Sequence, residues 1–212
     1  MKFLNKDNIL CLSPHPDDIE YGVLASMLKY KDTKFKILVL SNGGDFDNSS
    51  GSSRKKECTS IWSEINNVNG FFINKKFVKE FSEDEWVSKI ENMYKIDDFD
   101  LILTTTKYDS HFEHRMVNNI SYALARTSKC GIVSYRTPST LENWNPNSYI
   151  DVDNFLDKKI NLLKKFKTQI SKNSKGRRYF EKDKIISFHV NYFAMKMGIK
   201  YVETFKINRH IE

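Results

Sequence analysis

Residues 8–18 read Asn8-Ile9-Leu10-Cys11-Leu12-Ser13-Pro14-His15-Pro16-Asp17-Asp18. The apolar run over 8–12 predicts a short buried strand, which Ser13-Pro14 ends. A helix is expected over 21–30, where apolar side chains recur on one side. The histidine and the two aspartates therefore fall in the turn that joins a strand to a helix.

The same alternation of strands and helices continues along the chain. Apolar runs predict further strands over 35–40, 71–73, 101–105 and 131–135, and helical spacing predicts helices over 54–65, 86–94 and 116–126. A capping box at Ser82 to Glu85 opens the second of these helices. A long helix with a basic tail is expected to begin at Asp153 and to include Ile170. Short apolar strands that alternate with helices predict an α/β fold with a mainly parallel sheet, in one domain over 1–212.

Composition limits the class of protein. The 212 residues include 34 Lys and Arg against 27 Asp and Glu, a net charge of +7. This balance suits anionic partners such as nucleotides, phosphorylated sugars or nucleic acid, or it reflects a generally lysine-rich composition. The three cysteines form no CxxC pair, which excludes a zinc-ribbon protein or a thioredoxin-like protein. With no signal peptide and no apolar stretch long enough to span a bilayer, a cytoplasmic protein with no membrane partner is expected.

The first polar cluster carries His15, Asp17 and Asp18 directly after the first predicted strand. Ligands in open α/β sheets bind beyond the carboxyl ends of the strands, so the position suits a functional site. Imidazole and carboxylate groups are both natural zinc ligands. The competing interpretation is an ordinary turn, since Pro and Asp are common turn residues.

The second cluster follows the predicted strand over 101–105. It holds His111 and His114, two of only five histidines in the chain, with Glu113 between them. Residues three apart share one face of a helix, so the two imidazoles can converge on one centre. The competing interpretation is a solvated helix start, which Ser110 and Glu113 would cap.

Together the clusters indicate a metal site. Both follow a predicted strand, so they meet at one edge of a parallel sheet and offer three histidines and several carboxylates. This set suffices for three protein ligands and a water molecule, the arrangement of a catalytic zinc site. Zinc would acidify the water and polarise an amide carbonyl, a free carboxylate would take the proton, and a further histidine would assist the oxyanion or the leaving amine. The residues alone do not settle which of Asp17 and Asp18 contacts the metal.

The ordered motifs resemble those of the PIG-L or LmbE-like family of zinc-dependent N-acetylglucosaminyl deacetylases. Pro14-His15-Pro16-Asp17-Asp18 resembles its first motif, and His111-Phe112-Glu113-His114 resembles its second, usually His-Pro-Asp-His. The remaining matches are Arg54-Lys55-Lys56-Glu57 to an Arg-x-x-Glu helix start, Lys159 with Lys167-Thr168-Gln169 to a late Lys and Ser-Gln stretch, and 198–205 to a closing Tyr-Ala-Glu-x-Phe strand.

This resemblance implies a Rossmann-like three-layer sandwich and removal of an acetyl group from a glucosamine-containing sugar or conjugate. It implies zinc ligands at His15, Asp18 and His114, with Asp17 as general base. It also implies that His111 stabilises the oxyanion or assists the leaving amine, and that Arg54 contacts the sugar or its aglycone. Phe112 and Glu113 depart from the family motif, and the longer Glu113 is expected to change the hydrogen bonds around His111.

Three readings of function follow from these residues. The first is the zinc deacetylase acting on a small N-acyl amino sugar, a nucleotide-sugar or a glycan conjugate, as a monomer or a homo-oligomer. The second keeps the metal but cleaves another amide conjugate. The third is a basic nucleic-acid-binding module, which no nucleic-acid-reading motif supports. Iron(II) can occupy the same ligands in place of zinc, because N/O sites discriminate weakly between divalent metals.

Overall fold

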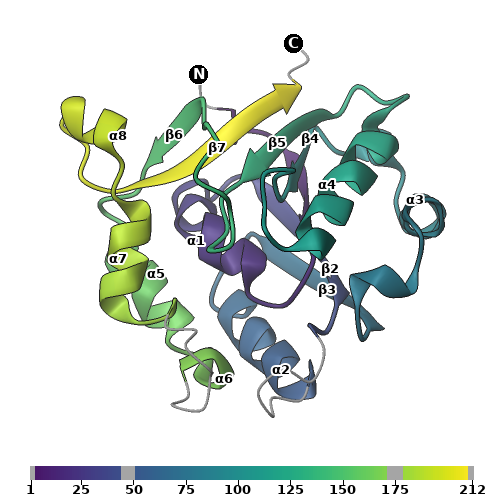
Figure 1. Cartoon of the computed structure of the whole chain (residues 1–212), viewed down its shortest axis with the longest axis horizontal. Coiled ribbons are helices and arrows are strands. Elements are labelled where there is room, and N and C mark those ends of the chain that lie inside the picture. The colour runs from purple at the N-terminus through teal and green to yellow at the C-terminus, as the bar shows by residue number, and fades with distance from the viewer. Residues whose placement is uncertain (1–2, 44–50, 171–178, 210–212) are drawn as a thin grey trace.

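The computed structural model describes residues 3–43, 51–170 and 179–209, and a seven-stranded sheet forms its centre (Figure 1). The strands are β1 (Asn8–Ser13), β2 (Lys34–Ser41), β3 (Val68–Lys75), β4 (Leu101–Thr104), β5 (Gly131–Tyr135), β6 (Ser148–Asp151) and β7 (Val202–Arg209). They are ordered β3-β2-β1-β4-β5-β7-β6. The first five pair in parallel, whereas β7 is antiparallel to both β5 and β6. The prediction of a mainly parallel sheet is confirmed.

Helices cover both faces of this sheet. They are α1 (Asp18–Lys29), α2 (Gly51–Trp62), α3 (Glu83–Met93), α4 (Phe112–Ala125), α5 (Leu156–Leu163), α6 (Lys167–Ile170), α7 (Lys182–His189) and α8 (Tyr192–Lys196), with short 3₁₀ turns η2 (Val78–Glu80) and η3 (Ile96–Asp98). Alternate residues of β1 enter opposite cores: Ile9 and Cys11 pack with residues of α1, α2, α5 and α7, and Leu10 and Leu12 pack with residues of α3 and α4. The predicted three-layer sandwich follows from this alternation (Figure 1).

Element boundaries follow local capping more closely than hydrophobic spacing. The predicted capping box is confirmed: Ser82 Oγ accepts the Glu85 N–H at 3.2 Å, and Glu85 Oε2 accepts the Ser82 N–H at 2.7 Å. Helix α3 therefore begins at Glu83, before the predicted start at 86. Helix α4 also begins earlier than predicted, at Phe112 rather than at 116, although its N-cap residue His111 makes no side-chain cap, and this start places His114 inside the first turn.

The prediction of one long helix that begins at Asp153 is wrong. Helix α5 ends at Leu163, and a separate short helix, α6, begins at Lys167. Between them Phe166 is fully buried, and its ring lies edge-on to Phe180 with centroids 5.4 Å apart. The chain turns here because burial of Phe166 against the following segment outweighs continuation of the helix.

A buried ionic cluster fixes the position of α1. The Lys159 ammonium donates to Glu203 Oε1 at 2.6 Å, to the Tyr21 carbonyl and to His189 Nε2 at 2.9 Å. Glu203 in turn accepts the backbone N–H groups of Ala25 and Ser26 at 2.9 and 2.8 Å. A buried charge requires partners of this kind. The cluster thus ties α5, α7 and β7 to α1, whose first turn carries a candidate metal ligand.

Candidate metal centre and active site

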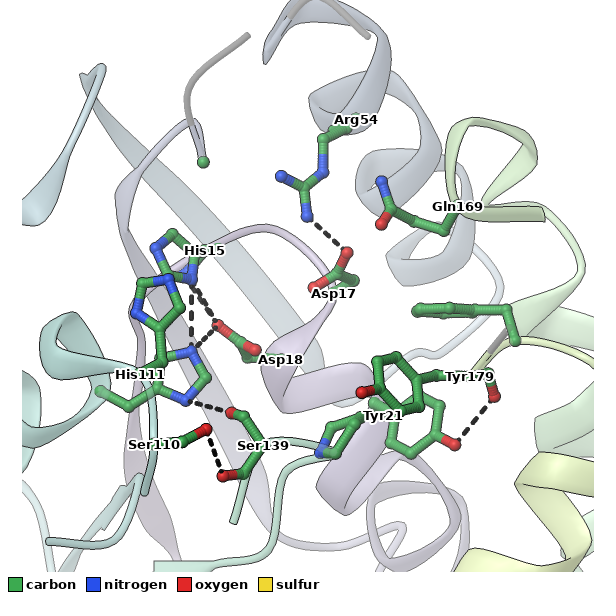
Figure 2. A pocket seen from close by; sticks show the side chains of 14 residues that line it. His15, Asp17, Asp18, Tyr21, Arg54, Ser110, His111, Ser139, Gln169 and Tyr179 are labelled. Atoms are coloured by element: carbon green, nitrogen blue, oxygen red, sulfur yellow. Dashed lines mark hydrogen bonds and ion pairs between the residues drawn. The ribbon is translucent and has the colours of Figure 1, made fainter. Parts of the chain in front are cut away.

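The two polar clusters meet at one edge of the sheet. Strands β1 and β4 are parallel neighbours, so the loops that follow Ser13 and Thr104 leave the sheet side by side. The first loop leads into α1 at Asp18, and the second leads into α4 with His111 at the N-cap position. The expectation that both clusters share one sheet edge is confirmed. Figure 2 shows the side chains of His15, Asp18 and His111 gathered there.

The three predicted ligands converge on one point. The Asp18 Oδ2 atom lies 3.1 Å from His15 Nδ1 and 3.3 Å from His114 Nε2, and the two ring nitrogens are 3.3 Å apart. All three side chains are buried. A tetrahedral zinc ion with bonds of about 2.0–2.2 Å holds its ligand atoms roughly 3.3–3.6 Å apart. The triangle therefore has nearly the dimensions that such an ion requires.

Carboxylates behind the triangle orient both imidazoles. Glu113 Oε2 lies 2.7 Å from His15 Nε2, and Asp109 Oδ2 lies 3.0 Å from His114 Nδ1. When these outer nitrogens donate their protons, the lone pairs of His15 Nδ1 and His114 Nε2 face Asp18. Carboxylate partners of this kind fix the tautomer of metal-binding histidines. Glu113 thus contacts His15, whereas the sequence placed its effect around His111.

The charges at this point favour a cation. Burial lowers the pKa of His114, but the neighbouring Asp18 and Asp109 outweigh this effect and raise that pKa to about 10. The same carboxylates would attract a divalent ion in place of the proton. Three inward-facing lone pairs within 3.3 Å of one another repel unless a proton or a cation lies among them. The donor set of two imidazoles and one carboxylate fits zinc or iron(II).

Asp17 lies beside this triangle in a strained backbone conformation. Its φ of 101° is in the left-handed region, where non-glycine residues are uncommon. The conformation turns its carboxylate away from that of Asp18 and toward Arg54, whose Nη2 lies 2.5 Å from Asp17 Oδ2 (Figure 2). Burial raises the pKa of Asp17, and the Arg54 charge opposes the rise only in part. The two adjacent aspartates therefore have different partners and different electrostatic surroundings.

His111 also faces the centre. Its backbone N–H donates to Asp109 Oδ1 at 2.8 Å, and its ring stacks on that of His114 with centroids 4.8 Å apart. Within the described part of the chain, its Nδ1 atom is buried without a hydrogen-bond partner. Burial, together with the nearby His15 and His114, lowers the pKa of His111 to about 4. A neutral imidazole thus lines the cavity beside the ligand triangle.

A cavity of about 330 Å³ opens over these groups. All six predicted site residues line it, namely His15, Asp17, Asp18, Arg54, His111 and His114. Sequence reasoning missed its aromatic wall, which Tyr21, Tyr179 and Phe180 form, with the Tyr21 hydroxyl donating to the Tyr179 carbonyl at 2.9 Å. The cavity thus combines polar groups on one side with aromatic rings on the other, as is common in small-molecule sites.

The chain belongs to the PIG-L family. The sequence model described as GlcNAc-PI de-N-acetylase matches residues 10–125, which include both clusters. The family is one of deacetylases, and its members have the α/β fold described above. No curated protein matches this chain.

Solved structures show the same fold over nearly the whole chain. The N,N'-diacetylchitobiose deacetylase from Pyrococcus horikoshii has a TM-score of 0.79 at 16% identity, covering 98% of this chain and 85% of that one. The deacetylase Dbv21, which is described as acting on the pseudoaglycone of the antimicrobial reagent A40926, has a TM-score of 0.70 at 18% identity, with 99% of each chain covered. A 4-carboxy-2-hydroxymuconate hydratase from Pseudomonas putida has a TM-score of 0.73 at 14% identity, covering 97% of this chain and 98% of that one. At such low identities the likeness establishes the fold alone. One of these proteins is a hydratase, so the fold does not by itself define the reaction.

Proposed function

We propose that this protein is a zinc-dependent amidohydrolase that removes an N-acetyl group from a glucosamine-containing sugar or sugar conjugate. The observation that carries the proposal is the triangle of His15 Nδ1, Asp18 Oδ2 and His114 Nε2, with sides of 3.1 to 3.3 Å, at the base of a cavity. His15, Asp18 and His114 would hold the metal. Zinc supplies Lewis acidity, which polarises an amide carbonyl and makes a water molecule more acidic. Iron(II) is an alternative occupant.

The remaining cavity residues provide the proton transfers. Asp17 is the general base: its carboxylate is turned away from Asp18 and stays free of the ligand triangle. It takes a proton from the attacking water as the new C–O bond forms. His111 stabilises the negative charge that develops on the carbonyl oxygen or assists the leaving amine as the C–N bond breaks. The products are acetate and a primary amine.

The substrate belongs to the small N-acyl amino sugars, nucleotide-sugars or glycan conjugates. Named relatives of the same fold act on diacetylchitobiose and on an antibiotic pseudoaglycone. A cavity of 330 Å³ with aromatic rings on one wall suits a sugar ring, which presents apolar C–H faces and polar hydroxyl edges. A cytoplasmic location and the absence of a nucleic-acid partner stay predictions. An amidase for a different amide conjugate would use the same groups.

The decisive assay measures primary amine released from a panel of N-acetyl sugars and conjugates, with and without added zinc. Asp17→Asn is expected to retain zinc and lose turnover by about 10²- to 10⁴-fold, because the base is removed while the ligands remain. Asp32→Asn, the same change at an exposed aspartate, is the matched control and should behave as wild type. Full activity of Asp17→Asn would exclude Asp17 as the base. Amine release from non-sugar amides alone would favour an amidase that acts on a different amide conjugate.

A further inference from the structure

The short helix α8 exposes an unusual group of apolar side chains. Among the described residues, Val190, Tyr192, Phe193, Met195 and Met197 are 41%, 65%, 59%, 57% and 61% exposed. Single exposed apolar residues are normal, but five within eight consecutive positions are a concentration, and the Tyr192 and Phe193 rings lie 5.8 Å apart between centroids. These five residues are called the α8 patch below.

The α8 patch lies on a helix that is capped and packed against the rest of the protein. Asn191 Oδ1 accepts the N–H groups of Phe193 and Ala194 at 2.9 and 3.3 Å, which caps the helix. Ala194 is fully buried and forms the inward side of the helix. The cap and the buried alanine thus hold the large apolar side chains outward. Figure 1 shows α8 at the periphery of the molecule, beyond α7 and β6.

The segment that carries the α8 patch is itself basic, and Asp183, which pairs with Lys184, lies just before it. From Lys184 to Val202 the sequence contains Lys184, Lys196 and Lys200 and no Asp or Glu. The Lys196 ammonium lies 4.6 Å from the Tyr192 ring centroid, so a positive charge borders the apolar surface directly. Asp153, between β6 and α5, also faces this segment, where its carboxylate accepts the backbone N–H groups of Lys200 and Tyr201.

We propose that the α8 patch docks on the surface of a bilayer that contains anionic phospholipid. Tyr192 and Phe193 would lie at the boundary between headgroups and acyl chains with the methionines, and Lys196 and Lys200 would contact lipid phosphates. An amphipathic surface with aromatic residues and lysines is suited to lie in the plane of this interface. A second copy of the chain is a poorer occupant, because a two-fold contact would bring the same lysines together with no acidic residue of the segment between them.

This inference replaces the expectation that no membrane partner exists. That expectation rested on the lack of a spanning stretch, and within the described residues no helix is long and apolar enough to cross a membrane. A helix that lies on the bilayer surface needs no such stretch. The proposal is independent of the deacetylase reaction, because no residue of the α8 patch lines the cavity.

Co-sedimentation of the full-length protein with vesicles tests the proposal. Binding is expected to phosphatidylcholine vesicles that contain phosphatidylglycerol, with much weaker binding to phosphatidylcholine alone and at high salt. Phe193→Ser/Met195→Ser/Met197→Ser should weaken binding to the anionic vesicles by at least about tenfold. Lys196→Glu/Lys200→Glu should do the same with the apolar side chains intact, which separates lost docking from misfolding.

Matched variants elsewhere on the surface complete the design. Tyr122→Ser/Leu141→Ser removes apolar side chains that are each 44% exposed, and Lys95→Glu/Lys129→Glu reverses exposed charges outside residues 184–202. Both should bind as wild type. The proposal is overturned if the wild type does not sediment with anionic vesicles, or if the control variants lose binding equally. Concentration-dependent dimerisation that the α8 serines abolish, without vesicle binding, would assign the patch to a second copy instead.

Discussion

Arg54 and Asp17 form a buried ion pair across the mouth of the metal centre, with Arg54 Nη2 2.5 Å from Asp17 Oδ2. The same Nη2 donates to the Pro16 carbonyl at 3.0 Å, and Arg54 as a residue is only 5% exposed. Arg54 therefore directs the carboxylate of the proposed base, in addition to lining the cavity. The sugar contact that the sequence indicated for Arg54 stays a prediction.

Substitution of Arg54 distinguishes these two roles. If Arg54 orients Asp17, Arg54→Met lowers kcat by at least about tenfold with little change in zinc content, because a misplaced base transfers protons poorly. A residue that only binds the sugar would raise KM and leave kcat unchanged. Steady-state kinetics of amine release, with metal analysis of the same samples, provide both quantities.

The stability of the same variants gives an independent check. Arg54→Met leaves the Asp17 carboxylate buried without its partner, which is expected to cost about 3–5 kcal/mol of unfolding free energy. Adding Asp17→Asn removes the stranded charge, so the double variant should be more stable than Arg54→Met alone. If the two effects are simply additive in urea unfolding, the pair is not coupled as described.

The carboxylates behind the imidazoles should control metal affinity. Glu113→Gln and Asp109→Asn each remove a charge that orients a ligand, and each is expected to weaken zinc binding by about 10- to 100-fold. His15→Ala and His114→Ala, which remove ligands themselves, should deplete zinc almost completely. Chelator competition measures these affinities. Wild-type affinity in Glu113→Gln would mean that its contact with His15 does not support the metal.

The meeting of the two clusters could be predicted from the sequence because its signals are local. His15 and Asp18 follow an apolar strand and a stiff Pro-His-Pro segment, and His114 follows a second strand of the same parallel sheet. Parallel strands place their carboxyl ends at one edge, so the meeting of the two clusters required only the fold class. The residues alone left open which of Asp17 and Asp18 would bind the metal, and the family resemblance indicated Asp18. The left-handed backbone that turns Asp17 toward Arg54 is not revealed by spacing.

Contacts that depend on long-range packing were not predictable in the same way. The direction of Glu113 toward His15 is set by where α4 begins, and this start was placed too late. Tyr179 and Phe180 line the cavity, and Phe180 packs against Phe166 at a point where helical spacing predicted a continuous helix. Tertiary burial decides such turns, and no short motif marks them.

Stability should depend on pH through His189, which is fully buried between Lys159 and the Ile185 carbonyl. Burial, together with the Lys159 charge, lowers the pKa of His189 well below its ordinary value. Below about pH 6.5 the unfolded chain binds a proton at His189 that the folded protein does not, so stability falls as the pH falls. His189 alone should cost about 2 kcal/mol between pH 7 and pH 5.

His189→Gln isolates this contribution, because glutamine can accept from Lys159 but does not titrate. Urea unfolding of both proteins at pH 7 and pH 5 should show the difference in free energy between wild type and variant shrink or reverse by that amount. Contributions from the metal ligands cancel in this comparison, since they are present in both proteins. Parallel pH profiles for the two proteins would refute the assignment.

Gly43 should be required for the position of Arg54. A Cβ atom at Gly43 would overlap Arg54 Nη1, and Gly43 has a φ of 76°. Gly198 has the same φ of 76° but nothing within 4 Å of its Cβ position, so Gly198→Ala carries the backbone cost without the overlap. That cost is about 1–2 kcal/mol for a left-handed residue.

Gly43→Ala should therefore lose more stability than Gly198→Ala. Only Gly43→Ala should lower kcat while the zinc content stays unchanged, because the displaced guanidinium no longer holds Asp17. Equal kinetics and equal unfolding free energies for the two alanine variants would show that the Arg54 side chain can move without affecting catalysis. The claim that its ion pair orients Asp17 would then be refuted.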